Sequence, residues 1–113
     1  MKAKKEANWY DKIFKENIEA VTPALVEKVL GIQVAYSEKI QTDLVRTLER
    51  KPDELIRITD QVGNTFLLQL EFQLADDDQM ADRMHEYYAI LRRKYKLPVR
   101  QYVVFLSSHG YSD

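Results

Sequence analysis

The chain has 113 residues, of which 45% are hydrophobic and 31% are charged, and its formal net charge at pH 7 is −1. This balance is typical of one globular domain that is long enough to bury its own core. The absence of cysteine excludes disulfides, thiolate zinc sites and thiol nucleophiles, and it agrees with a reducing cytoplasm. The near-neutral charge argues against a tight, non-specific DNA binder, because neutralisation of phosphates dominates that kind of affinity.

The N-terminus carries lysines at positions 2, 4 and 5 but no apolar stretch after them, so we expect no signal peptide. No apolar run approaches the length of a membrane span. We expect residues 1–7 to form a flexible tail and residues 8–113 to form a single domain.

The first predicted helix begins near Trp9, with Asn8 as its cap. Its apolar stripe consists of Phe14, Ile18, Val21 and Leu25. Thr22 and Pro23 predict a kink or a restart, with Thr22 as cap and Pro23 at the first helical position. Gly31 is expected to end the helix.

Three strands are predicted next. The segment Val34 to Glu49 has no clean pattern, and we interpret part of it as a strand. Residues Glu54 to Thr59 and Phe66 to Gln73 then predict a hairpin, joined by a turn at Gln61 to Asn64. In its second strand, Phe66, Leu68, Leu70 and Phe72 should face one way, and Leu67, Gln69, Glu71 and Gln73 the other.

A second helix is predicted to open at Asp76 to Asp78, where acidic residues favour the positive end of the helix dipole. Its apolar stripe consists of Met80, Met84, Tyr87, Leu91 and Tyr95. Pro98 should end it, and Val99 to Leu106 predicts a buried strand. The basic residues Arg92, Arg93, Lys94, Lys96 and Arg100 suit a helix C-terminus, with contact to a DNA backbone as the alternative.

Two acidic residues mark the hairpin as a candidate metal site. Asp53 starts its first strand and Glu71 ends its second, so folding the strands back brings the carboxylates together. Oxygen ligands of this kind suit Mg²⁺. The two residues share a face only if cross-strand partner numbers have an even sum, which requires a loop with an odd residue count or a bulge. The alternative is that Pro52-Asp53 is ordinary turn chemistry and Glu71 a solvated strand end.

Several ordered motifs extend this interpretation over Asn8 to Leu106. They are Tyr10-Asp11-Lys12-Ile13-Phe14-Lys15, Pro52-Asp53, Leu70-Glu71-Phe72-Gln73, Met80 with Arg83-Met84 and Tyr87-Tyr88, and Pro98-Val99 with Gln101-Tyr102-Val103-Val104. Together they resemble the PD-(D/E)xK nucleases, in particular the transposase-like or recombination-promoting subgroup. The resemblance implies a restriction-endonuclease-like αβββαβ core, an α/β (α+β) fold with a mixed sheet flanked by helices. Members usually continue beyond this length, so we expect a shortened or truncated nuclease domain.

The same resemblance implies a role for each site residue. Asp53, Glu71 and the carbonyl of Phe72 would bind Mg²⁺ or Mn²⁺, and Asp53, Glu71 and Gln73 would be catalytic. Gln73 stands where the family usually has lysine, although the subgroup commonly carries glutamine. Asp11, Lys15, Glu16 and Arg83 are accessory candidates; for Asp11 and Lys15 the alternative is an ion pair one helical turn apart.

Three hypotheses about function follow. The first is a Mg²⁺-dependent DNA endonuclease of the cytoplasm, linked to mobile elements or recombination, with DNA as its partner. The second is a catalytically weak DNA-binding or assembly module of a mobile element. The third is a self-associating domain whose uncovered sheet edge pairs with a second copy in a homodimer.

Overall fold

The structure is a computed structural model that describes residues 18–41, 52–73 and 77–106. Its elements, in chain order, are helix α2 (Ile18–Ala24), the π-helical segment η1 (Leu25–Val29), strands β1 (Val34–Lys39), β2 (Glu54–Asp60) and β3 (Thr65–Gln73), helix α3 (Met80–Tyr95) and strand β4 (Val99–Phe105). This order of helix, three strands, helix and strand is the predicted one. The uncertain segment from Val34 contributes the strand β1.

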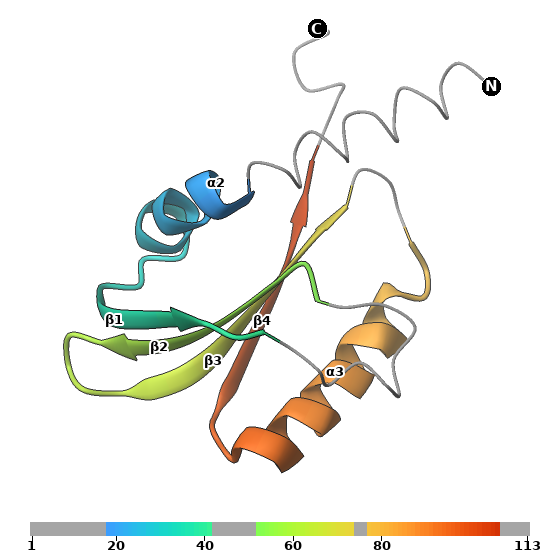
Figure 1. The fold of residues 1–113 in the computed structure, drawn as a ribbon. Coiled ribbons are helices and arrows are strands. Elements are labelled where there is room, and N and C mark those ends of the chain that lie inside the picture. Colours follow the sequence, from blue (N-terminus) through green and yellow to red (C-terminus); the bar gives the residue numbers. More distant parts are fainter. Residues whose placement is uncertain (1–17, 42–51, 74–76, 107–113) are drawn as a thin grey trace, which may run out of the picture.

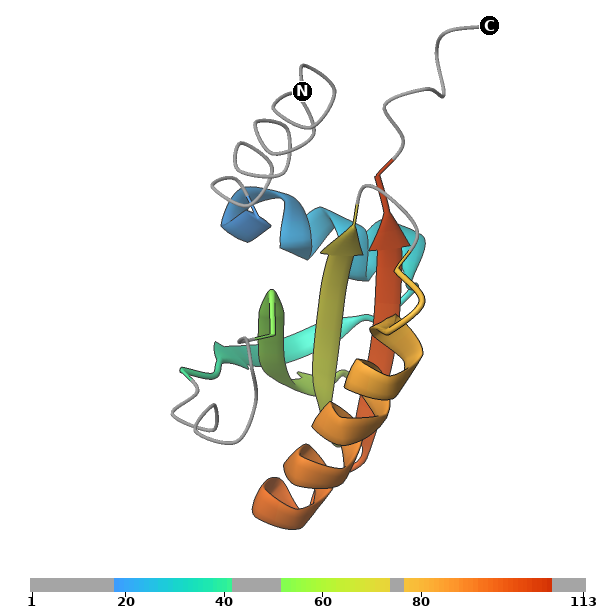
Figure 2. The same cartoon turned by 90° about the vertical axis from the view of Figure 1, so that its right-hand side faces the viewer.

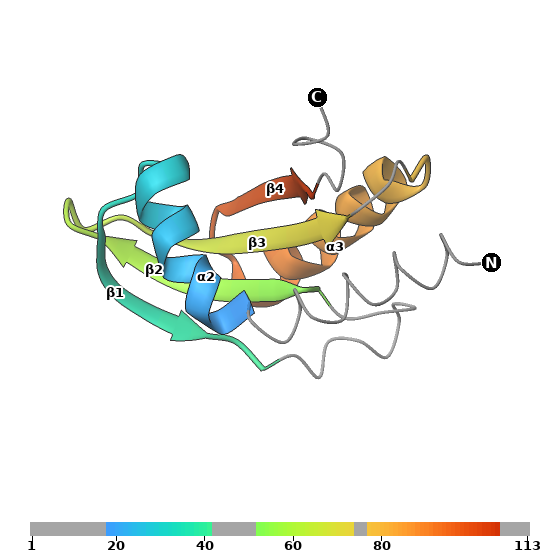
Figure 3. The ribbon, with the colours of Figure 1, turned by 90° about the horizontal axis from the view of Figure 1, so that it is seen from above.

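The strands form a mixed sheet in the order β1-β2-β3-β4 (Figure 1). The first two pairings are antiparallel, whereas β3 and β4 are parallel because α3 carries the chain back between them. In the view from above, α2 crosses one face of the sheet while α3 lies behind the other (Figure 3). The predicted α+β class with a mixed sheet flanked by helices is therefore confirmed.

Strand β3 is the centre of both cores, because its side chains alternate between the two faces. Four large apolar side chains, Phe66, Leu68, Leu70 and Phe72, pack with Val26 and Ile32. We call this the α2 face. On the α3 face, Leu67 packs with Leu55 of β2 and with the buried stripe of α3. Both halves of the predicted alternation are confirmed.

The turn between β2 and β3 occupies residues 61–64, as predicted. The last cross-strand pair is Thr59 with Thr65, and the N–H of Asp60 also donates to the carbonyl of Asn64 at 2.9 Å. Asp60 pairs with Val34 in β1, and its carboxylate accepts the backbone N–H groups of Val62 and Asn64. An odd number of residues, 60–64, separates the two members of the last cross-strand pair, as the metal site requires. One step beyond the pair Glu54–Leu70, the register places Asp53 opposite Glu71.

The predicted helix restart at Thr22 and Pro23 is wrong. Pro23 lies inside α2, and the helix then widens into η1, where the N–H of Leu30 reaches the carbonyl of Leu25. A proline removes an N–H from the helical ladder, and a π turn absorbs such a defect. Thr22 is buried and donates to Glu54 of β2 instead of capping. Gly31, with φ of +70°, ends the helix as predicted.

The apolar face of this N-terminal helix is also rotated from the predicted one. Val21 is exposed, whereas Leu25 is partly buried against the core as predicted. The fully buried side chains of this segment are Thr22 and Val26. Phe14 lies outside the described residues, as does the side chain of Ile18. The widened turn of η1 shifts the angular position of the residues after Ala24, which a regular helical period does not anticipate.

Helix α3 follows the prediction closely. Met80, Met84, Tyr87 and Leu91 are buried, and the partly buried Tyr95 packs beside them. Asp77 accepts the N–H of Gln79 and thereby supports the start of the helix, while Asp78 is exposed. Among the helices of the described ranges, none has the length and apolar content needed to cross a bilayer.

Strand β4 is not the buried strand that was predicted. Its side chains are half-buried at most, and Arg100 and Phe105 are exposed. The reason is its place in the sheet, since β4 pairs only with β3 among the strands that the structure describes. Arg100 lies over the ring of Phe66 at 3.9 Å, which covers part of this edge.

The Asp60 turn yields a prediction about acid stability. The N–H of Asn64, followed by that of Val62, lowers the pKa of Asp60 below 3.8. The charged form therefore stabilises the fold above pH 3.8, and this contribution is lost as the pH falls through the lowered pKa. We expect Asp60→Asn to be less stable than wild type at pH 7, with the difference shrinking towards pH 2. Urea unfolding at both pH values measures it, with Glu86→Gln on the exposed side of α3 as control; a pH-independent difference would contradict it.

Candidate metal site

The predicted acidic pair comes together at the C-terminal end of β3. The backbone N–H of Asp53 donates to Glu71 Oε2 at 3.0 Å, and the backbone N–H of Phe72 donates to Asp53 Oδ2 at 2.8 Å. The carboxylate on β3 thus accepts an N–H from the residue before β2, and the carboxylate before β2 accepts an N–H from β3. These crossed bonds replace the strand ladder beyond Glu54 and fix both acids on the α3 face.

Glu71 is fully buried, with 0% of its surface exposed. Besides the N–H of Asp53, its Oε2 atom accepts a hydrogen bond from Gln69 Nε2 at 3.2 Å. A carboxylate in a protein interior is tolerated only when donors replace the lost water. The alternative that Glu71 is a solvated strand end is excluded by this burial.

The carbonyl of Phe72 points towards Asp53. In a strand, the N–H and C=O of one residue point to the same side, and consecutive residues alternate. The N–H of Phe72 reaches Asp53, whereas the carbonyl of Gln73 accepts Leu106 of the segment after β4. Strand geometry therefore puts the Phe72 carbonyl on the side of β3 that faces the start of β2, where Asp53 lies. Two carboxylates and a carbonyl are a set of oxygen atoms that fits a hard divalent cation.

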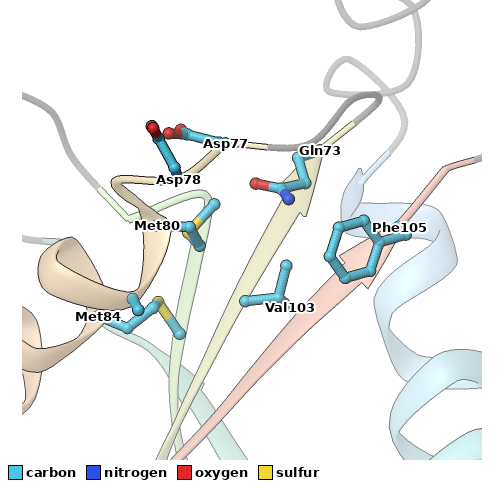
Figure 4. A pocket seen from close by; sticks show the side chains of 8 residues that line it. Gln73, Asp77, Asp78, Met80, Met84, Val103 and Phe105 are labelled. Carbon is cyan, nitrogen blue, oxygen red and sulfur yellow. The ribbon is translucent and has the colours of Figure 1, made fainter.

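Gln73 lies on the same side as Glu71 and lines a pocket of about 500 Å³ between β3, β4 and the start of α3 (Figure 4). Its carboxamide lies between Met80 on one side and Val103 and Phe105 on the other, with Asp77 near the rim. The Oε1 atom of Gln73 is buried, and no described residue donates a hydrogen bond to it. The Gln73 amide therefore holds a buried acceptor oxygen for which the described residues provide no donor.

Arg83, an accessory candidate, is engaged at the start of α3. Its Nη2 atom lies 2.7 Å from Asp77 Oδ2, and both side chains are partly exposed. Arg83 thus pairs with a carboxylate of the segment before α3. The remaining accessory candidates, Asp11, Lys15 and Glu16, lie outside the described residues.

Two further glutamines, the buried Gln69 and the partly buried Gln101, contact the site and were not predicted as site residues. Gln69 is 0% exposed, and its Oε1 atom accepts Gln101 Nε2 of β4 at 2.8 Å. Gln101 Nε2 also donates to the carbonyl of Met84 in α3 at 2.8 Å. The available signal was the polar series at positions 69, 71 and 73 in a strand that is otherwise apolar.

Glu54 is a second buried acid, on the α2 face directly behind Asp53, and it too was not predicted. It is 3% exposed, accepts Thr22 Oγ1 at 3.0 Å and lies 3.6 Å from Lys39 Nζ. These contacts attach α2 and β1 to the start of β2. Within residues 18–41, 52–73 and 77–106, no group of three or more His, Asp or Glu side chains is placed to hold a metal ion.

The predicted basic stretch lies at the opposite end of the sheet from the acids. Helix α3 runs back along β3 and β4, so its basic C-terminal turn lies near the start of both strands (Figure 2). Val99 is level with Leu67, and Phe105 is level with Gln73. Six strand steps of about 3.3 Å separate Leu67 from Gln73, so the basic end and the acidic end of the sheet lie about 20 Å apart. His85 is exposed on α3, and His109 lies outside the described residues.

Comparisons of the chain with protein-family models, curated proteins and solved structures gave no match.

The crossed bonds at Asp53 predict a loss of stability on substitution. Asp53→Ala removes the acceptor of the Phe72 N–H, and a hydrogen bond to a charged group contributes about 1.5–3 kcal/mol. We expect the free energy of unfolding to fall by about this amount. Asp53→Asn keeps one acceptor oxygen and should lose less. Urea unfolding at pH 7 without metal measures both, and equal stability of Asp53→Ala and wild type would contradict the crossed arrangement.

Proposed function

We propose that this chain is a metal-dependent DNA endonuclease of the PD-(D/E)xK type. Asp53, Glu71 and the Phe72 carbonyl would bind Mg²⁺ or Mn²⁺, and Gln73 would hold the attacking water. The observation that carries the proposal is the crossed pair of hydrogen bonds at Asp53, which brings both acids to one face at the end of the central strand. Of the two acids, Glu71 is fully buried and Asp53 is partly buried.

The wider architecture supports the same reading. The element order and the mixed sheet with a helix on each face agree with a restriction-endonuclease-like core. Asp53 precedes β2 and Glu71 lies near the end of β3.

Each residue of the site would have a separate task. A bound Mg²⁺ supplies a Lewis acid that activates water and offsets charge growing on the phosphate. Asp53 and Glu71 would provide its negative ligands, and the Phe72 carbonyl a neutral one. Gln73 Oε1 would accept a hydrogen bond from the water and orient it. An amide has no charge and is no base near neutral pH. Gln73 would therefore position the water, but it would not deprotonate it, and it would not stabilise negative charge as a lysine does.

DNA is the proposed substrate, and its contacts would come from two ends of the molecule. The basic turn formed by Arg92, Arg93, Lys94 and Lys96 lies about 20 Å from the acids, or about six nucleotide steps of 3.4 Å. A duplex lying along α3 would meet both. We place this activity in the cytoplasm and link it to mobile elements or recombination, as the motifs of the sequence suggest.

One observation favours the second candidate function, a catalytically weak DNA-binding or assembly module. Glu71 is fully buried, and its Oε2 atom already accepts two hydrogen bonds. A hydrated cation reaches this carboxylate only if the surroundings open. A module that retained the acids for folding alone would show the same arrangement.

Metal binding separates the two candidates. A ligand present at about 100 times its Kd stabilises the native state by about 2.7 kcal/mol. We expect Mg²⁺ or Mn²⁺ to raise the melting temperature of wild type and to support DNA cleavage. Asp53→Ala and Glu71→Gln should fold but lose both effects. An undiminished rise in both variants would place the metal elsewhere, and no rise in wild type would favour the binding module.

Gln73→Lys tests the role of the amide. Lysine has a similar reach and adds a positive charge beside the acids, which stabilises the growing negative charge of the transition state. We expect faster DNA cleavage in Mg²⁺ than for wild type, measured as single-turnover rate. Gln33→Lys, on the exposed segment before β1, controls for the added charge. A rate lowered by Gln73→Lys alone would show that the site depends on the amide itself.

A further inference from the structure

A chain of hydrogen bonds links Glu71 to the backbone of α3 through two side-chain amides. Gln101 Nε2 donates both to the Met84 carbonyl and to Gln69 Oε1. Gln69 Nε2 in turn donates to Glu71 Oε2. The direction of each bond is fixed by chemistry, because a carboxylate and a backbone carbonyl only accept. Gln101 must therefore turn its NH₂ group to Met84 and Gln69, and Gln69 must turn its NH₂ group to Glu71.

These amides are unusual for their place in the fold. Gln69 is fully buried on the α3 face, between the apolar Leu67 and the stripe of α3. Burying an amide costs free energy unless its hydrogen bonds are satisfied, and an apolar side chain of the same volume avoids that cost. Gln69 uses both ends of its amide for this chain, and its Nε2 also lies 3.7 Å from Met84 Sδ. Packing alone does not call for glutamine here.

We propose that Gln69 and Gln101 are positioning residues that orient Glu71 for metal binding; this inference rests on the proposed function. Gln69 acts on Glu71 directly, since its NH₂ group fixes the rotation of the carboxylate. Gln101 acts through Gln69, by holding the plane of the neighbouring amide. The Met84 carbonyl anchors the chain, because it belongs to the rigid middle of α3.

Partners of this kind tune a metal site from outside its ligands. Groups that hydrogen-bond a metal ligand fix its orientation, and their loss costs about 10–100-fold in metal affinity. The position of α3 on the sheet would therefore affect the orientation of the Glu71 carboxylate. Met84 also lines the pocket beside Gln73, so the same turn of α3 contacts both halves of the proposed site.

The test uses methionine, which is close to glutamine in volume and lacks its donors. In Mn²⁺ titrations of the full chain by calorimetry, we expect Gln69→Met to bind about 10–100-fold more weakly than wild type. Gln101→Met should shift affinity in the same direction by a smaller factor. The double variant should bind no more weakly than Gln69→Met, because Gln101 acts only through Gln69. Gln61→Met, in the exposed turn, is the control.

The outcomes separate this inference from the proposed function. Wild-type affinity in both variants, with only a lower urea midpoint, would overturn the positioning role and leave the metal site intact. Additive losses in the double variant would overturn the relay through Gln69. No Mn²⁺ binding by wild type would overturn the metal site and this inference together. The expected affinity pattern without DNA cleavage would uphold the positioning role and reject the nuclease. If Gln69→Met does not fold, the comparison of Gln101→Met with wild type decides.

Discussion

The central strand β3 is buried on both faces, and it carries a carboxylate at 0% exposure. That charge has to be satisfied from within the fold. The start of β2 supplies the N–H of Asp53, and β3 itself supplies Gln69, which in turn requires Gln101 of β4 and the carbonyl of Met84. The positions of β2, β4 and α3 relative to β3 are thus coupled to the hydrogen bonds of Glu71. A polar network of this kind specifies one arrangement more sharply than apolar packing does.

A second network, on the opposite face, fixes the register of the same strands. Asp53 and Glu54 are consecutive, so they point to opposite faces, and Glu54 meets Thr22 of α2 and Lys39 of β1. A slip of one residue would exchange the two acids between faces. It would bury Glu54 against Gln69 and Glu71 and leave Thr22 without its acceptor. The hairpin register is therefore set by charges on both faces, in addition to the apolar pattern.

Local periodicity was enough to predict much of the fold. The alternation in β3 and the stripe of α3 come from contacts that repeat every two or every three to four residues, so both were predicted correctly. The proximity of Asp53 and Glu71 followed from the same hairpin. What the sequence could not supply depends on distant partners: Thr22 with Glu54, and Gln69 with Gln101, each lie 32 residues apart. The same holds for Asp60, whose place in β2 is decided by β1, and for the exposed edge position of β4.

The arrangement of the acids is costly in a way that bears on function. Glu71 is fully buried and Asp53 is partly buried, and a backbone N–H group donates to each carboxylate, which lowers the cost of holding the two charges close together. Apolar residues of similar volume at such positions are often as stable or more stable. Gln69 and Gln101 add a buried and a partly buried amide to the same cluster. The fold therefore maintains five polar groups where packing requires none: the two carboxylates, the two amides and the unpaired Oε1 of Gln73. Their convergence on one end of β3, beside the pocket, is the observation on which the proposed binding of a cation and water rests.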